Sequence, residues 1–261
     1  MIAGADKAAA TAAEAAKGKS KPHKKGDFVF TPEEIAREGA HGIDQTNYPN
    51  CWFESAMSAL AQLPRGQKLM ARMITYGDND SYVVRFPGDG VEYKITEAEL
   101  KESGVECKAK WASLLDYAER KKFPDNIGSN GADGDQSRLQ VGLGCITGCT
   151  AEHISPYQAS NQELSSFIYG AVSSQNPITA GTVGRSSVPL PVVTQHAYTI
   201  IGFEPARNMV ILRNPHGKNG KKFKVINDPQ HLHFEQLDDG VFKMNLDYFR
   251  VCFSWVCRSF I

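Results

Sequence analysis

The segment Gly42-Ile-Asp-Gln-Thr-Asn-Tyr-Pro-Asn-Cys-Trp-Phe-Glu-Ser-Ala56 carries the strongest signal in this chain of 261 residues. Apolar residues recur at helical spacing after the cysteine, which predicts a helix from Asn50 to about Leu63 that Pro64 ends. Asn50 is a favoured N-cap residue, so Cys51 falls at the first position of the predicted helix.

A cysteine at this position is suited to act as a nucleophile. The helix dipole and the backbone N–H groups of a first turn stabilise an anion, which lowers the pKa of a thiol there. Attack on a carbonyl carbon requires a thiolate, so Cys51 is the predicted nucleophile. Gln45 stands six residues earlier, and its side-chain amide is predicted to donate to the oxyanion together with the Cys51 N–H. On this segment alone, a buried cysteine on a core helix remains the alternative.

Two later segments supply a base and a residue that orients it. His196 begins the apolar stretch 196–203, and Asn214 follows the apolar stretch 209–213. Both stretches are predicted to be strands, adjacent and antiparallel, with a turn near 205–208. Their ends would bring the Asn214 side-chain carbonyl to one imidazole nitrogen and leave the other for Cys51. A lone histidine on an apolar strand is more often a core residue, but three roles in this chain order favour a catalytic triad.

The remaining pattern is rich in helices first and in strands later. We expect a hairpin formed by 81–86 and 91–95, helices around 111–118 and 164–172, and a long surface loop over 124–144. Further strands are expected over 178–183, 223–226, 242–245 and 251–256. This order predicts an α+β protein with a helix-rich lobe over 27–175 and a β-rich lobe over 176–261.

Together the motifs resemble the protease core of the calpains, a branch of the papain-like cysteine peptidases. Gln45 and Cys51-Trp, His196-Ala-Tyr, and Arg213-Asn-Pro-x-Gly carry the resemblance, which is looser over the rest of 42–250. The separation of His196 from Cys51 lies within the range of papain-type enzymes. The resemblance implies a papain-like two-lobed fold, helical in its N-terminal lobe and antiparallel and β-rich in its C-terminal lobe. It also implies a site in the cleft between the lobes and hydrolysis of peptide bonds through a thioester.

Residues beside two of these motifs depart from the calpain pattern. Pro49-Asn50 stands where calpains usually carry Gly-Asp before the cysteine. His216 stands where they carry the tryptophan that shields the His–Asn hydrogen bond. Two outcomes are open at His216: its ring stacks over that bond, or the bond is wetter and weaker.

Composition gives no sign of a membrane or nucleic-acid protein. Lys+Arg and Asp+Glu number 29 each, so the whole chain is formally neutral. Residues 1–26 are rich in Ala and Lys and are expected to form a disordered tail, with nucleic-acid or membrane-surface binding as the alternative. No secretory signal and no apolar run of membrane length is present, so we expect a cytoplasmic protein, an effector or a domain of a larger one.

Metal and cofactor signals in the sequence are weak. The cysteine pairs at 145/149 and 252/257 miss the usual zinc spacing, and buried free thiols are expected there. The histidines and glutamate of 231–235 would share one face of a strand and could hold a metal, but a polar loop is the favoured interpretation. No cofactor is evident, and calcium dependence rests on the resemblance alone.

We therefore expect a cysteine endopeptidase, a thiol protease that hydrolyses protein or peptide substrates. Cys51, His196 and Asn214 form its triad, and Gln45 is the oxyanion donor. The alternatives are a protein-glutamine deamidase or transglutaminase-type acyl transferase that uses the same thiolate, and an inactive interaction module. Nucleic acid and membranes are not expected partners, and the sequence carries no signal of oligomeric state.

Overall fold

The computed structural model describes residues 23–45, 48–124, 136–182, 192–217, 234–238 and 240–261. Of these residues 43% are helical and 26% lie in strands, which confirms the expected mixture of α and β structure. Among the helices of these ranges, none combines the length and apolar character needed to span a bilayer.

The strands of the described residues form two antiparallel sheets. The small sheet has the order β1–β2–β3, and the large sheet has the order β4–β10–β5–β6–β7–β9–β8. Their bounds are β1 Ile74–Tyr76, β2 Ser81–Arg85, β3 Glu92–Thr96, β4 Glu152–Ile154, β5 Ile178–Thr182, β6 Ala197–Glu204, β7 Met209–Arg213, β8 Phe234–Asp238, β9 Val241–Asn245 and β10 Phe253–Arg258.

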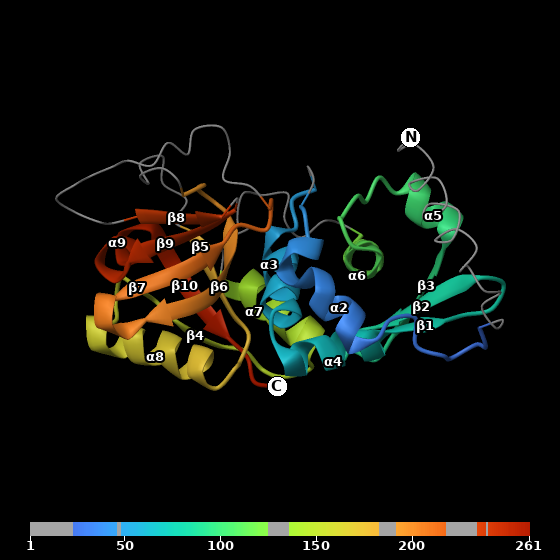
Figure 1. The fold of residues 1–261 in the computed structure, drawn as a ribbon, viewed down its shortest axis with the longest axis horizontal. Coiled ribbons are helices and arrows are strands. Elements are labelled where there is room, and N and C mark those ends of the chain that lie inside the picture. Colours follow the sequence, from blue (N-terminus) through green and yellow to red (C-terminus); the bar gives the residue numbers. More distant parts are fainter. Residues whose placement is uncertain (1–22, 46–47, 125–135, 183–191, 218–233, 239) are drawn as a thin grey trace, which may run out of the picture.

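The helices lie beside and between these sheets. Helix α3 stands between the large and the small sheet (Figure 1), and every one of its residues is buried. The bounds are α2 Pro32–Glu38, η1 Gly39–Gly42, α3 Cys51–Ala61, α4 Pro64–Met73, α5 Glu97–Glu102, α6 Lys110–Lys122, α7 Gln136–Thr147, α8 Asn161–Ser173, η2 Pro205–Arg207 and α9 Leu246–Cys252.

Buried apolar side chains form two cores. The first core surrounds α3, α6, α7 and the small sheet and contains Trp52 and Trp111. The second core lies between the large sheet and the helices α8 and α9 and contains Phe249. Ala197 belongs to the first core, whereas Tyr198 belongs to the second. The start of β6 therefore lies where the two cores meet.

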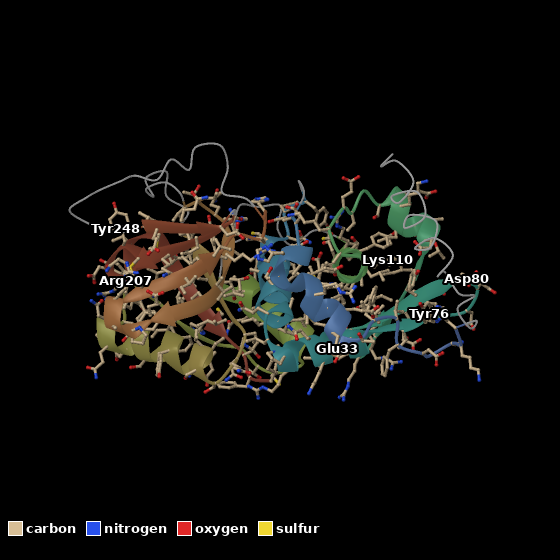
Figure 2. All side chains as sticks on the ribbon, in the orientation of Figure 1. Glu33, Tyr76, Asp80, Lys110, Arg207 and Tyr248 are labelled. Carbon is tan, nitrogen blue, oxygen red and sulfur yellow. The ribbon has the colours of Figure 1, made fainter. Side chains whose placement is uncertain are left out.

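Charged side chains on the surface connect the small sheet to the helices next to it. Lys110, labelled in Figure 2, lies at the start of α6. Its ammonium group is 4.7 Å from the centre of the Tyr82 ring and pairs with Glu97 on α5. Tyr76 and Asp80 lie at the end of the molecule formed by the small sheet, and Arg207 lies at the opposite end. Gly26, at the end of the predicted tail, donates its N–H to the Tyr76 carbonyl at 2.8 Å. Residues 1–22 of that tail lie outside the described residues.

Most of the expected elements are present. The hairpin of β2 and β3, the helices α6 and α8, and the strands β5, β6, β7 and β9 lie where they were predicted. The strand expected over 251–256 is partly wrong, because residues 251–252 belong to α9 and β10 begins at Phe253. The strand predicted over 223–226 lies outside the described residues.

The structure extends one expectation about helices and contradicts another. Pro64 ends α3 as expected, but it also occupies the first turn of α4, where its missing N–H costs no hydrogen bond. The surface loop expected over 124–144 is contradicted from Gln136 onward, because α7 begins there. This helix buries Leu139, Leu143 and Ile146, and it packs against α3. Residues 125–135 of the expected loop lie outside the described part of the chain.

Candidate functional site

Cys51 is the first residue of α3, as predicted, and its side chain is only 1% exposed. The Asn50 carbonyl accepts from the N–H groups of Phe53 and Glu54 at 2.9 and 3.0 Å, which closes the first turn. Asn50 occupies the N-cap position, but its side chain makes no capping hydrogen bond, contrary to expectation. The sulfur therefore lies at the positive end of the helix dipole.

His196 and Asn214 form the pair that the sequence predicts. Strands β6 and β7 are antiparallel neighbours, and His196 Nε2 lies 2.9 Å from Asn214 Oδ1. The backbone N–H of His216 donates to the same Oδ1 at 3.1 Å, so this atom must be the amide oxygen. An oxygen acceptor requires that Nε2 carries the proton. In the neutral ring Nδ1 is then the atom that can accept a proton.

The backbone directly after His196 contacts the sulfur. The Ala197 N–H donates to Cys51 Sγ at 3.4 Å. Thr182 on β5 holds the His196 backbone: the His196 N–H donates to Thr182 Oγ1 at 2.9 Å, and the Thr182 N–H donates to the His196 carbonyl at 2.9 Å. An N–H donor on sulfur stabilises a thiolate relative to a thiol. The first residue of β6 therefore supplies a donor to the sulfur, and the residue before it carries the imidazole.

Burial keeps His196 neutral. Desolvation, followed by repulsion from His216, lowers the pKa of His196 to about 3, although the bond to Asn214 opposes this shift. The His196 ring lies between two other rings, edge-on to Tyr198 at 5.0 Å and stacked on His216 at 4.7 Å between centroids. A neutral, fixed imidazole is the form that takes a proton from a nucleophile.

Gln45 lies on the loop before α3 and is buried. Its backbone N–H donates to the Pro215 carbonyl at 2.9 Å, and its side-chain nitrogen donates to the Tyr48 carbonyl at 2.8 Å. The side-chain oxygen is buried and makes no hydrogen bond to the described residues. The amide nitrogen carries a second N–H, so its bond to Tyr48 leaves one donor for an oxyanion.

Arg213 anchors the end of β7 and was not predicted as part of the site. Its guanidinium is buried and donates to Ser58 Oγ at 3.1 Å on α3 and to the Ile43 carbonyl at 2.8 Å. Burial lowers its pKa to about 10, so it is still a cation at neutral pH. This side chain joins β7, and therefore Asn214, to both α3 and the loop that carries Gln45.

A buried carboxyl cluster, formed by Glu54, Asp116 and Glu119, lies beside the loop that precedes Cys51 and was not predicted. The Asn50 amide donates to Asp116 Oδ1 and, at 3.1 Å, to Glu119 Oε2. Desolvation is the largest cause that raises the pKa of all three carboxyl groups, and it brings that of Glu119 to about 8. The cluster therefore shares protons at neutral pH.

A cation also links this cluster to the loop. Arg120 pairs with Asp116 at 2.8 Å, and its guanidinium lies 4.0 Å from the centre of the Tyr48 ring. The residues just before Cys51 are thus held on α6 by two side chains, Tyr48 and Asn50. No local sequence pattern indicates these contacts, because α6 lies more than sixty residues further along the chain.

One group among the described residues has the ligand types of a metal site. Ligand atoms of Glu54, Cys107 and Asp116 lie within 4.8 Å of one another. Asp116 already binds Arg120, and burial raises the pKa of the Cys107 thiol, which disfavours the thiolate that a metal needs. The chemistry of these three side chains is therefore better suited to sharing protons with one another than to binding a metal ion.

Among the described residues, the two cysteine pairs considered in the sequence do not form a group of metal ligands. All six cysteines are free thiols. Cys145, Cys252 and Cys257 are buried as expected, but Cys149 is exposed, so the expectation of a buried thiol was wrong at that position. His231 and His233 lie outside the described residues, and Glu235 lies 3.3 Å from Arg207.

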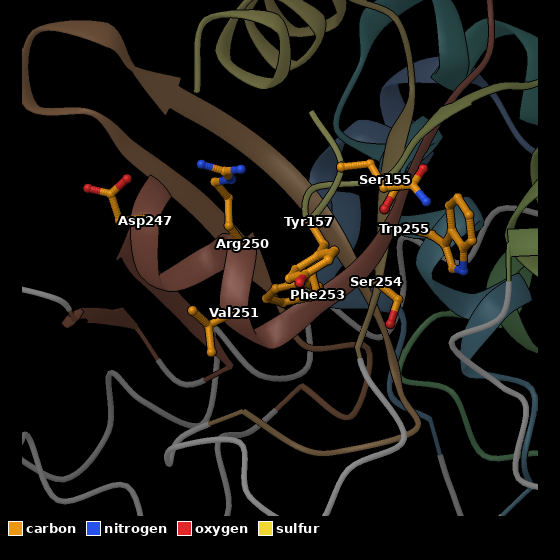
Figure 3. Close-up of a pocket in the computed structure, with 9 residues that line it drawn as sticks. Ser155, Tyr157, Asp247, Arg250, Val251, Phe253, Ser254 and Trp255 are labelled. Atoms are coloured by element: carbon orange, nitrogen blue, oxygen red, sulfur yellow. The ribbon is translucent and has the colours of Figure 1, made fainter. Parts of the chain in front are cut away.

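A pocket of about 630 Å³ lies away from these residues, next to α9 and β10 (Figure 3). Tyr157, Val251 and Trp255 line it, and none of the four predicted site residues does. Its one arginine, Arg250, donates to the carbonyls of Pro156 and Ala159 at 2.9 and 2.6 Å. The guanidinium of Arg250 therefore bonds to the backbone of the protein itself.

Neither a scan of protein-family models nor a comparison with curated proteins returns a match to this chain.

Proposed function

We propose that this protein is a cysteine peptidase, with Cys51 as nucleophile, His196 as base and Asn214 as the residue that orients the base. The observation that carries the proposal is the hydrogen-bonded His196–Asn214 pair beside a sulfur at a helix N-terminus. The motif resemblance to the calpain core supports it independently of the geometry.

The proposed reaction begins with transfer of the Cys51 proton to His196 Nδ1. The thiolate attacks the carbonyl carbon of the scissile peptide bond, and the carbonyl oxygen becomes an oxyanion. The side-chain N–H of Gln45 and the backbone N–H of Cys51 donate to that oxygen. Collapse expels the amine, which takes the proton from His196, and leaves a thioester. Water, deprotonated by His196, hydrolyses the thioester and restores the thiol.

The two hydrophobic cores correspond, in this proposal, to the two lobes of a papain-like fold. The helix that carries Cys51 belongs to the first core, and β6 and β7 present His196 and Asn214 from the large sheet. The substrate would bind in the cleft between the lobes. A site where two such units meet takes its nucleophile from one and its base from the other.

Because the sulfur of Cys51 is buried, the first experiment tests whether a reagent can reach and alkylate it. We expect an epoxide reagent for thiol proteases to label Cys51, although its side chain is only 1% exposed. Cys149 is exposed, so Cys149→Ala is the control for non-specific alkylation and should leave the labelling of Cys51 unchanged. Loss of labelling in His196→Ala, with the fold intact, would support activation by the imidazole. A folded wild-type protein in which no reagent reaches Cys51 would rule out the proposed function.

The type of reaction is tested with a peptide pool followed by mass spectrometry, with and without a calcium chelator. Backbone cleavage that Cys51→Ala abolishes is the expected result. Mass changes at single glutamine residues without cleavage would identify an acyl transferase or deamidase instead. Loss of cleavage with the chelator would establish the calcium dependence that the resemblance suggests.

A further inference from the structure

His216 contacts three components of the candidate site. Its ring is stacked on His196 with an interplanar angle of 6°, and its backbone N–H donates to Asn214 Oδ1 at 3.1 Å. Its Nδ1 lies 3.2 Å from the backbone carbonyl oxygen of Gln45. A carbonyl oxygen only accepts, so Nδ1 carries a proton in this arrangement. The base, its orienting residue and the oxyanion-donor loop thus all contact one residue.

Two hydrogen bonds join the loop before α3 to the end of β7. The Gln45 N–H donates to the Pro215 carbonyl at 2.9 Å, and His216 Nδ1–H donates to the Gln45 carbonyl. Gln45 is thus held through both of its backbone polar groups. A change at His216 should therefore alter the position of Gln45 relative to His196 without changing either residue.

A proton added to His216 goes to Nε2 and makes the ring a cation. The ring centroids of His216 and His196 are 4.7 Å apart, so a charge on one opposes a charge on the other. Among the described residues, Arg213 lies on the strand end that carries His216, and Asp44 and Lys108 lie next to Gly217. Asp44 pairs with Lys108 at 3.5 Å, and Arg213 is itself a cation. Protonation of His216 therefore disfavours the imidazolium that His196 forms in the reaction.

We propose that His216 is a positioning residue, which fixes the ring of His196 and aligns Gln45 with that ring. When His216 itself becomes protonated, it disfavours the imidazolium form of His196. This inference rests on the proposed function of Cys51 and His196. This role differs from simple packing because three properties of His216 act on different groups. The ring contacts His196, the Nδ1–H bonds to Gln45, and the charge opposes protonation of His196.

Two variants separate these effects. His216→Phe keeps an aromatic ring over His196 but removes the donor to Gln45 and the charge. His216→Asn keeps an N–H near the position of Nδ1 but removes the ring. Alkylation of Cys51 depends on the thiolate and on His196, whereas peptide hydrolysis also needs the oxyanion donor Gln45. Rates of both reactions are measured from pH 4 to pH 9, with circular dichroism to confirm the fold.

For His216→Phe we expect the wild-type maximum of the alkylation rate, an acid limb displaced to lower pH by on the order of one unit, and a kcat lower by about tenfold. For His216→Asn we expect the maximum alkylation rate itself to fall by about tenfold, because His196 loses its stacked neighbour. His153→Phe, which changes an exposed histidine on β4, is the matched control and should alter neither rate.

Identical pH profiles and maximum rates for the wild type and both folded variants would overturn this inference and leave the proposed function intact. A folded wild type whose Cys51 is not alkylated at any pH would overturn both.

Discussion

Raising the pH should destabilise this protein through its buried carboxyl cluster, and Glu119→Gln should remove a large part of the effect. Burial, followed by repulsion from Asp116, raises the pKa of Glu119 from its ordinary 4.5 to about 8. Between pH 4.5 and about 8, Glu119 thus keeps its proton in the folded state but loses it in the unfolded chain. Stability is therefore fully present below pH 4.5 and declines as the pH rises through about 8.

The size of the effect follows from the interval between the two pKa values. Each pH unit of difference is worth about 1.4 kcal/mol, so Glu119 accounts for a loss of at most about 5 kcal/mol between pH 4.5 and pH 8. Proton sharing with Asp116 and Glu54 spreads this loss over the cluster. A realistic difference between the wild type and Glu119→Gln is about 2–3 kcal/mol at pH 8.5, with the variant more stable. Gln is a neutral isostere and still offers an oxygen to the Asn50 amide, which donates to Glu119 at 3.1 Å.

Urea unfolding of the wild type and the variant between pH 5 and pH 9, followed by circular dichroism, measures this difference. Glu106→Gln removes the charge of an exposed carboxyl group and is the matched control, for which the curves should stay parallel to the wild type. If the free energy of unfolding of Glu119→Gln depends on pH as steeply as that of the wild type, the carboxyl group is ionised in the folded state at neutral pH and the reasoning fails.

Two further predictions concern the triad and the packing of its helix. Asn214→Ala removes the acceptor that fixes the His196 tautomer and should lower the rate of Cys51 alkylation by on the order of tenfold to hundredfold at neutral pH; an unchanged rate would contradict the role of Asn214. Gly142→Ala should destabilise the fold by about 2 kcal/mol in urea unfolding, since its Cβ would lie 2.8 Å from the Trp52 carbonyl oxygen. Gly144→Ala is the control on the same helix, because its Cβ would meet only the Cys149 carbonyl at 3.6 Å; equal effects of the two substitutions would refute the packing argument.

The His196–Asn214 pair was predictable from sequence because its geometry is local. Strands β6 and β7 are consecutive in the chain, and their antiparallel register follows from the short η2 turn between them. Once the two strands pair, the residue just before β6 and the residue just after β7 lie at the same end of the strand pair. The contact between the two side chains could therefore be predicted without knowledge of the rest of the fold.

The position of the Asn50 side chain was not predictable in the same way. Its residue type favours an N-cap, and it does occupy that position. Its amide instead binds carboxyl groups on α6, which local propensity cannot anticipate. Burial of those carboxyl groups depends on tertiary packing, so the pKa shift of Glu119 could not be derived from sequence either.

Helix α7 shows how packing overrides local composition. Gly142 and Gly144 lower the intrinsic helix propensity of this segment, and the composition of the whole 124–144 stretch favours a loop. Leu139 and Leu143, four residues apart, lie on one helix face and are fully buried. Gly142 lets that face approach the α3 backbone closely. The helical signal was present in the leucine spacing, but it was weaker than the loop signal until the packing partner was known.

The location of the candidate site explains how a buried thiol and a buried imidazole could still react. Protonation of His196 alone is costly, because burial lowers its pKa to about 3. Ionisation of Cys51 alone would place a single negative charge among buried side chains. Transfer of the proton from the sulfur to the ring creates both charges together, so their mutual attraction offsets part of both desolvation costs. The helix dipole and the Ala197 N–H act on the sulfur at the same time. In the proposed reaction, reactivity is therefore a property of the Cys51–His196 pair and not of either residue alone.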